Sequence, residues 1–239
     1  MCIRDSKRIE QGLNDIGIKG SELDGVLITH EHSDHVKGLG VLARKHGVPI
    51  YSTKETLEEL RTMKSLGDYP EELLCPVAHD VDFFIGDLEI KPFKISHDAA
   101  NPVAYRVQEG KKSVAVATDM GNYSQYTIER LQGLDAILLE SNHDIKMLEA
   151  GPYPYYLKKR ILGEYGHLSN DNAGRLLSCV LHDNLKHIFL GHLSKENNYE
   201  ELAYETVKLE IAESDTPYHS SDFPITVAKR DAVSEIVTI

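Results

Sequence analysis

The chain has 239 residues and a formal net charge of −12 when histidine is counted as neutral. This length suits one large α/β domain with a sizeable core. The acidity argues against a broad electrostatic grip on nucleic acid, although bound divalent metals change the field locally. Three widely spaced cysteines do not fit a disulfide framework and favour a reducing compartment. No apolar run approaches the roughly 18 residues that cross a bilayer, so the sequence predicts a cytoplasmic protein with no membrane partner.

Hydrophobic periodicity predicts alternating helices and strands along most of the chain. A helix is expected over 7–17, ended by Gly17, followed by a short buried strand over 25–29 and a helix over 36–47, ended by Gly47. Further elements follow in chain order: strands at 49–52, 88–95, 103–108, 113–118, 136–140, 187–191 and 225–229, a hairpin turn at 109–112, and helices near 54–65, 154–164, 170–182 and 198–212. This pattern indicates an α/β fold. The sequence GHLS occurs at 166–169 and again at 191–194, but the flanks differ, so a solenoid repeat is not expected.

The segment THEHSDH, residues 29–35, concentrates metal-ligand side chains. His30 and His32 stand two residues apart after a buried strand, so both imidazoles can point the same way in an extended loop. Asp34 and His35 are expected to start the next helix and to face a neighbouring point. Four ligand-type residues within six positions favour a metal site over a polar surface loop.

Three further ligand types follow predicted strands. His97, Asp119 and His192 each come directly after an apolar run, at the end where α/β sheets usually present their sites. Two adjacent metals need more ligands than one loop supplies. These residues are therefore candidate partners for the 29–35 segment.

Together these motifs resemble the metallo-β-lactamase fold, and in detail the YycJ/WalJ (VicX) family. The stretches that carry the resemblance are LITHEHSDHVKGLGVLARKHGVPIY, ISHDAANPVAY, ATDMG, LLESNHD, GHLSN, LGHLSKENN and TVAKRDAVSE. The resemblance implies a four-layer αββα sandwich formed by one domain over residues 1–239. It also implies two divalent metal ions, with His30, His32 and His97 holding one, Asp34, His35 and His192 holding the other, and Asp119 bridging. Zinc and manganese both suit histidine and carboxylate ligands, and iron is possible as well.

The amino terminus departs from the family pattern. Members normally begin with a strand pair and an Asp-containing turn, whereas here MCIRDS leads at once into a predicted helix. We expect residues 1–6 to be foreign to the family and the chain to lack its N-terminal strands. A normal short start is the alternative.

A second functional pair is expected at His167 and Glu140. The stretch EYGHLSNDNAGRLL resembles the ribonuclease Z segment in which a histidine opens a helix and acts in catalysis beside an acidic residue at an earlier strand end. Glu140 matches that acidic position and could orient His167. The alternative is that His167 only caps or packs the helix. Ser169 or Asn170 is the expected N-cap.

The function that follows is a dinuclear metal-dependent hydrolase. The sequence favours a phosphodiesterase or nuclease acting on DNA, 5′–3′ exonuclease-like, through a metal-bound hydroxide. Asp34 or Asp119 would orient this nucleophile, and His167 would supply a proton to the leaving oxygen. Two alternatives stay open: a hydrolase of small esters, lactones or thioesters, and a non-enzymatic accessory protein of a cell-wall two-component signalling system.

Two other features have open interpretations. The segment PYPYYLKKR, residues 152–160, could stack bases and contact phosphates beside the site, or could be a helix that packs its tyrosines and solvates its lysines. The remaining histidines without ligand spacing are expected at the surface: His46, His79, His182, His187 and His219.

Overall fold

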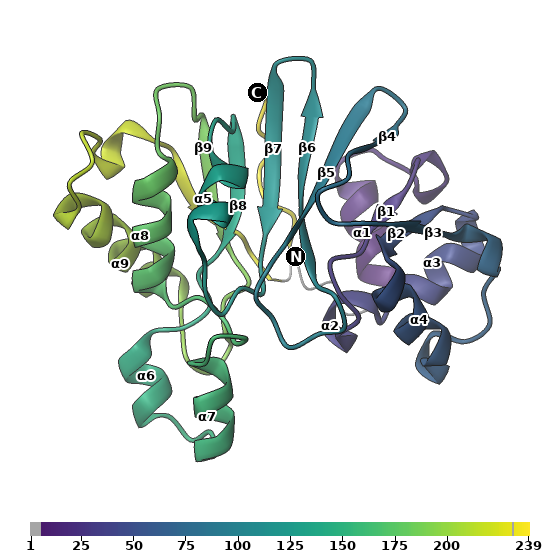
Figure 1. Ribbon diagram of the computed structural model, residues 1–239, viewed down its shortest axis with the longest axis horizontal. Coiled ribbons are helices and arrows are strands. Elements are labelled where there is room, and N and C mark those ends of the chain that lie inside the picture. Colours follow the sequence, from purple (N-terminus) through teal and green to yellow (C-terminus); the bar gives the residue numbers. More distant parts are fainter. Residues whose placement is uncertain (1–5, 231) are drawn as a thin grey trace. The chain divides into compact units, whose positions relative to one another are not determined.

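The computed structural model in Figure 1 describes residues 6–230 and 232–239. The chain divides into two compact units. The first comprises Met1–Lys94, Ala99–Tyr105 and Arg230–Ser234, and the second comprises Ile95–Asp98, Arg106–Lys229 and Glu235–Ile239. Residues 1–5, most of the segment expected to be foreign, lie outside the described residues. The assignment of the whole chain to one domain stays a prediction.

The first unit contains a three-stranded parallel sheet in the order β1-β2-β3. Apolar side chains of its helices and strands form a buried core that includes Ile28, Ile50 and Leu57. A hairpin of β4 and β5 pairs antiparallel. Its helices and strands are α1 (Ser6–Asp15), β1 (Val26–Leu27), α2 (Ser33–Val36), α3 (Leu39–His46), β2 (Ile50–Thr53), α4 (Lys54–Thr62), β3 (Leu74–Val77), β4 (Phe83–Ile85) and β5 (Leu88–Lys94), with short 3-10 turns at Gly20–Glu22, Lys64–Leu66 and Glu71–Leu73.

The single helix predicted over 36–47 is wrong. The segment forms the end of α2 and then α3, separated by Lys37 and Gly38. Glycine weakens a helix interior, and both Gly38 and Gly40 fall inside the predicted helix. The predicted end is confirmed, because Gly47 caps α3 in the left-handed region with φ 63°.

The second unit is built on parallel strands in the order β10-β9-β8-β7. The hairpin turn predicted at 109–112 is confirmed, with Gly110 at φ 57°. Strand β6 (Val103–Glu109) begins in the first unit and ends in the second. The remaining elements are β7 (Lys112–Ala117), α5 (Gln125–Leu131), β8 (Ala136–Glu140), α6 (Ile145–Ala150), α7 (Tyr155–Ile161), α8 (Asn170–Val180), β9 (His187–Gly191), α9 (Glu200–Glu213), a 3-10 turn at Ser220–Asp222 and β10 (Ile225–Val227).

Strand register places three predicted site residues at one edge of this second sheet. Ala117 of β7 lies opposite Leu139 of β8, and Glu140 lies opposite Gly191 of β9. His192 follows β9 directly and Asp119 lies two residues after the end of β7, so both join Glu140 at the carboxyl ends of three neighbouring strands. This is the edge at which parallel sheets usually bind ligands.

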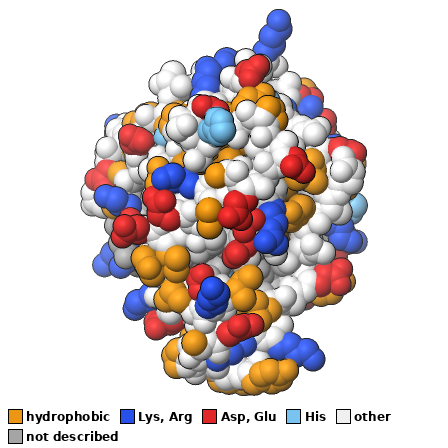
Figure 2. Space-filling model, turned by 90° about the vertical axis from the view of Figure 1, so that its left-hand side faces the viewer, with side chains coloured by type: hydrophobic (Ala, Val, Ile, Leu, Met, Phe, Trp, Pro, Cys, Tyr) orange, Lys and Arg blue, Asp and Glu red, His pale blue; other side chains and the backbone are white. Residues whose placement is uncertain are grey.

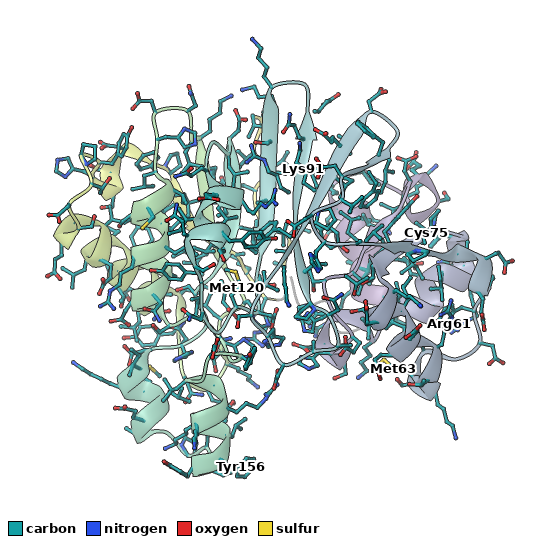
Figure 3. All side chains as sticks on the ribbon, viewed as in Figure 1. Arg61, Met63, Cys75, Lys91, Met120 and Tyr156 are labelled. Carbon is teal, nitrogen blue, oxygen red and sulfur yellow. The ribbon has the colours of Figure 1, made fainter. Side chains whose placement is uncertain are left out.

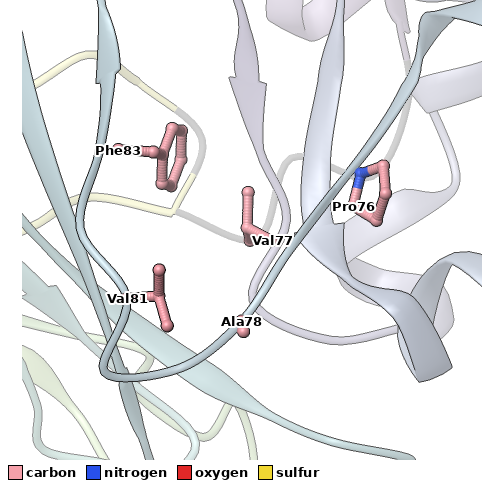
Figure 4. A pocket seen from close by; sticks show the side chains of 5 residues that line it. All are labelled: Pro76, Val77, Ala78, Val81 and Phe83. Carbon is pink, nitrogen blue, oxygen red and sulfur yellow. The ribbon is translucent and has the colours of Figure 1, made fainter.

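An apolar hollow of about 430 Å³ lies in the first unit and is shown in Figure 4. Its lining residues are Pro76, Val77, Ala78, Val81 and Phe83. None of these side chains can donate a proton or bind a metal, so the hollow is not the reaction site.

Two expectations about placement have different outcomes. His187, expected at the surface, is only 5% exposed within β9 and forms a 2.7 Å hydrogen bond with Thr226 Oγ1. No helix among the described residues is long and apolar enough to span a membrane.

Candidate metal and catalytic site

The predicted ligands of residues 29–35 gather in the loop between β1 and α2 of the first unit. Ring centroids of His30 lie 4.6 Å from those of His32 and 4.2 Å from those of His35. Thr29 Oγ1 lies 3.0 Å from His30 Nδ1 and 3.5 Å from His35 Nδ1. Asp34 starts α2, as expected, with Oδ2 3.8 Å from His35 Nε2. The loop therefore presents three imidazoles and a carboxylate together.

Hydrogen bonds from distant residues hold the start of this loop. Ile28 N–H donates to Tyr51 O (2.9 Å), and Tyr105 O–H donates to Ile28 O (2.9 Å). Val103 N–H donates to Thr29 O (3.0 Å). Because the two residues that precede His30 are bonded to three residues distant in sequence, the start of the loop is pre-organised.

In the second unit, Asp119, Glu140, His167 and His192 form one cluster. Each offers a ligand-type atom, and these atoms all lie within 4.8 Å of one another. Glu140 Oε1 is 2.9 Å from His167 Nδ1 and 2.7 Å from His192 Nδ1. The acidic orienting residue predicted for His167 is thus in contact with it, and the same oxygen also contacts His192.

The carboxylate of Glu140 is fully buried and its other oxygen is occupied by the backbone. Met120 N–H (2.8 Å) and Leu168 N–H (3.0 Å) both donate to Oε2. Burial by itself raises the pKa of Glu140, but the attraction and hydrogen bonds of His167 and His192 outweigh it and lower the pKa to about 2. Glu140 is therefore ionised and can only accept hydrogen bonds.

This acceptor decides which ring nitrogens carry protons. Since Glu140 cannot donate, His167 and His192 must each donate through Nδ1–H, which leaves Nε2 as the remaining nitrogen of each ring. The two rings then differ. His192 directs Nε2 to within 3.5 Å of Asp119 Oδ1, whereas the His167 atom that lies near this oxygen is Nδ1, at 3.6 Å.

The His167 ring has a further electrostatic property. Burial lowers its pKa, but Glu140 and, more weakly, Asp119 raise it more, and the net shift is upward. A histidine with a raised pKa is well suited to hold a proton near neutral pH.

His97 is oriented by a backbone carbonyl in the same unit. Its Nδ1–H donates to Gly166 O (3.0 Å), because a carbonyl oxygen can only accept. Nε2 is left facing Asp119, 3.6 Å from Oδ1. A ring that donates through one nitrogen and presents the other is the usual arrangement of a metal-binding histidine.

Replacing Gly166 by alanine is expected to disturb this orientation. A Cβ at residue 166 would overlap the carbonyl oxygens of Arg160 and Ile161, so the loop must move and carry the His97 acceptor with it. We expect metal affinity to fall about tenfold, the usual effect of losing an outer hydrogen-bond partner, measured by competition with a chelator. Gly12→Ala is the matched control, because its Cβ would meet only Val233 at an ordinary 3.4 Å. Equal affinity in both variants would contradict the assigned role of Gly166.

Two of the candidate ligands have left-handed backbone conformations. Asp119 has φ 61° and His192 has φ 57°, a region that residues other than glycine adopt infrequently. Asn142 Nδ2 donates to His192 O (2.8 Å) and so supports the second of these turns. The strained turns bend the chain directly after β7 and β9.

The predicted site residues are therefore distributed over both units. The first unit carries His30, His32, Asp34 and His35, and the second carries His97, Asp119, Glu140, His167 and His192. The sequence assigned no role to three supporting residues, Thr29, Asn142 and Gly166, although Asn142 is a suggestive neighbour of Glu140 in the stretch LLESNHD. Thr29 is adjacent to the histidine motif and could have been noted, whereas nothing in the sequence indicates the other two roles.

The donor set fits divalent metals. Imidazole nitrogens and carboxylate oxygens are the ligands of zinc, manganese and iron sites, and the orienting hydrogen bonds that such histidines need are present at His97 and His192. Together with the family described next, these groups indicate divalent metal binding.

Sequence comparison decides the family. Residues 9–185 match a protein family described as Beta-lactamase superfamily domain. The chain is 40% identical over 211 residues to exodeoxyribonuclease WalJ of Streptococcus pneumoniae, covering 87% of this chain and 78% of that protein. It is also 40% identical over 209 residues to exodeoxyribonuclease YycJ of Bacillus anthracis, covering 87% and 75%. The chain belongs to the WalJ/YycJ family.

Solved structures agree with a metallo-β-lactamase fold for this WalJ/YycJ family member. Zn²⁺-bound PqqB from Methylobacterium extorquens aligns with a TM-score of 0.63 at 17% identity, covering 89% of this chain and 73% of that one. A diphosphatase of the PhnP family aligns with a TM-score of 0.60 at 18% identity, covering 97% and 76%. At these identities the likeness concerns the fold alone, and it confirms the predicted fold class.

Proposed function

We propose that this protein is a metal-dependent exodeoxyribonuclease that hydrolyses phosphodiester bonds of DNA in the cytoplasm, working in the 5′–3′ direction. The observation that carries the proposal is the cluster of Asp119, Glu140, His167 and His192, found in a chain that shares 40% identity with proteins named exodeoxyribonucleases. The cluster combines metal-ligand atoms with a histidine held for proton transfer.

The metal ligands are proposed as the family resemblance implies. His30, His32 and His97 would hold one divalent cation, Asp34, His35 and His192 the second, and Asp119 would serve both. When bound, such cations lower the pKa of water toward about 7 and polarise the oxygens of a phosphodiester. Zinc or manganese is the expected metal, and iron fits the same donors.

The difference between the two GHLS histidines supports separate roles. His192 turns Nε2 toward Asp119, as two ligands of one ion would lie. In His167 the nitrogen nearest Asp119 is Nδ1, which is already bonded to Glu140. The Nε2 of His167 is therefore left for another partner. We assign His192 to metal binding and His167 to protonation of the leaving oxygen.

The carboxylates complete the proposed mechanism. Glu140 holds the His167 ring through Nδ1 and stabilises its protonated form. Asp34 or Asp119 orients the attacking water by accepting a hydrogen bond from it. In this proposal the proton lost by water and the proton given to the leaving oxygen pass through different groups.

The test is degradation of DNA labelled at the 5′ or the 3′ end, in single-stranded and duplex form. We expect mononucleotide release from one end only, loss of at least about 100-fold of the rate after chelation, and recovery with zinc or manganese. Turnover of small esters or lactones with intact DNA would replace this proposal with the small-ester alternative. Absence of any hydrolysis by metal-loaded protein would refute both.

A further inference from the structure

A group of exposed side chains on α7, which we call the α7 platform, consists of Tyr155, Tyr156 and Lys159. Tyr155 is 81% exposed and Tyr156 is 74% exposed, the two most exposed aromatic side chains among the described residues. Figure 3 labels Tyr156, whose ring lies beyond the ribbon of α7. In Figure 2, hydrophobic and basic side chains gather at the lower end of the face, over the region of α6 and α7. Aromatic rings this exposed are typical of binding surfaces.

Folding of the helix does not require these rings. Ile161, 8% exposed, and the half-buried Leu157 form the inner face of α7. The tyrosines lie on the outer face, where they bury little area. The alternative that this helix packs its tyrosines therefore fails for Tyr155 and Tyr156.

The positive charge of α7 favours a negatively charged partner. The whole chain carries a net charge of −12, yet α7 contains three cations and no acidic residue. Lys159 is exposed one turn after Tyr155, at the spacing where side chains are neighbours on a helix. Alternating aromatic and cationic groups match a single nucleic-acid strand, which offers base faces for stacking and phosphates for the cation.

Helix α7 is bonded to the catalytic cluster of its own unit. His167 N–H donates to Ile161 O at the end of α7 (3.0 Å), and Arg160 NH2 donates to Asp98, the neighbour of His97 (2.8 Å). Tyr156 precedes Ile161 by five residues, which corresponds to about 7.5 Å along the helix axis. The α7 platform therefore lies on a helix that is hydrogen-bonded to the catalytic cluster of the same unit.

We infer that the α7 platform stacks unpaired bases of single-stranded DNA close to the bond that is cut. The inference rests on the proposed nuclease function and deepens it by naming the substrate form. A frayed or single-stranded end fits the platform, whereas bases paired in a blunt duplex do not expose the faces that the tyrosines need.

The first test compares Tyr155→Ala/Tyr156→Ala with the wild type. Anisotropy of fluorescein-labelled, phosphorothioate-linked oligothymidylate measures binding without cleavage, and we expect Kd to rise about tenfold or more. KM for unmodified single-stranded DNA should rise equally, with kcat unchanged, because the cluster around Glu140 is intact. Tyr155→Phe/Tyr156→Phe should bind like the wild type, since phenylalanine stacks equally well. Phe84→Ala, which removes a 67% exposed aromatic ring from β4, is the matched control and should change nothing.

The second test places abasic nucleotides in the DNA. Abasic positions are moved one nucleotide at a time away from the cleaved bond, and the strand that lacks the stacked bases should bind the wild type about as weakly as the alanine variant binds intact DNA. The variant should lose no further affinity for the abasic strand, which is the signature of a direct contact in a double-mutant cycle.

The outcomes separate the two proposals. If the wild type cleaves DNA and the double alanine variant has the same Kd and KM as the wild type, the proposed role of the α7 platform is wrong. The proposed nuclease function is then unaffected. A wild-type protein that cleaves no DNA overturns the nuclease function, and the anisotropy comparison then still decides whether the tyrosines bind a single strand.

Discussion

Glu140→Ala is expected to lower both the stability and the activity of the protein more than any other single change at the site. The buried carboxylate accepts hydrogen bonds from Met120 N–H, Leu168 N–H, His167 and His192. Removing it leaves two backbone donors and two ring donors without an acceptor. Breaking a buried, charge-assisted network in this way costs about 3 to 5 kcal/mol of unfolding free energy. Nuclease activity should fall at least about 100-fold, because His167 loses its orientation.

The substitution Glu140→Gln should recover little of this loss. A glutamine fills the same volume, but it has no charge to attract the two histidines. If its amide nitrogen faces them, each ring must move its proton to Nε2 and accept through Nδ1, and Nε2 can then no longer bind a metal. Unfolding both variants with denaturant in the presence of a chelator measures the unfolding free energy without a contribution from metal binding. Glu205→Ala, at an exposed glutamate of α9 that pairs with Lys208, is the control and should stay within about 0.5 kcal/mol of the wild type. If Glu140→Ala has the same unfolding free energy as the wild type, then the hydrogen-bond network around Glu140 does not stabilise the fold.

His192→Ala and His167→Ala are expected to separate metal binding from turnover. Both histidines contact the same oxygen of Glu140, but His192 turns Nε2 toward Asp119. Metal affinity of His192→Ala should fall by more than the roughly 10- to 100-fold that loss of an outer partner costs. His167→Ala should retain its metal and lose about 10²- to 10⁴-fold in kcat.

Elemental analysis after dialysis, followed by single-turnover cleavage of labelled DNA, measures the two effects on the same samples. His219→Ala, at an exposed histidine of the second unit, should match the wild type in both. If His167→Ala loses metal as fully as His192→Ala, then both histidines are ligands and the proton donor must be sought elsewhere.

Much of the local structure follows from the sequence. Strands β8 and β9 lie over 136–140 and 187–191, as predicted, because continuous apolar runs of this length are buried in a parallel sheet. Elements that were missed are short or atypical. Strand β3 contains Pro76 and lies at the edge of the three-stranded order, where proline is tolerated but the sequence pattern argues against a strand. Helices α5 and α6 have seven and six residues, too few to show a helical period.

The sequence by itself determined the ligand types of the site and their places after strands, because apolar periodicity and residue chemistry are local properties. Only the tertiary structure decided how the two GHLS histidines differ. His167 and His192 meet at Glu140 across separations of 27 and 52 residues, and which ring nitrogen each one presents depends on strand register and on the left-handed turn at His192. Hydrogen bonds between residues so far apart have no periodic signal in the sequence. For the same reason, the sequence could not predict that the carbonyl of Gly166 orients His97.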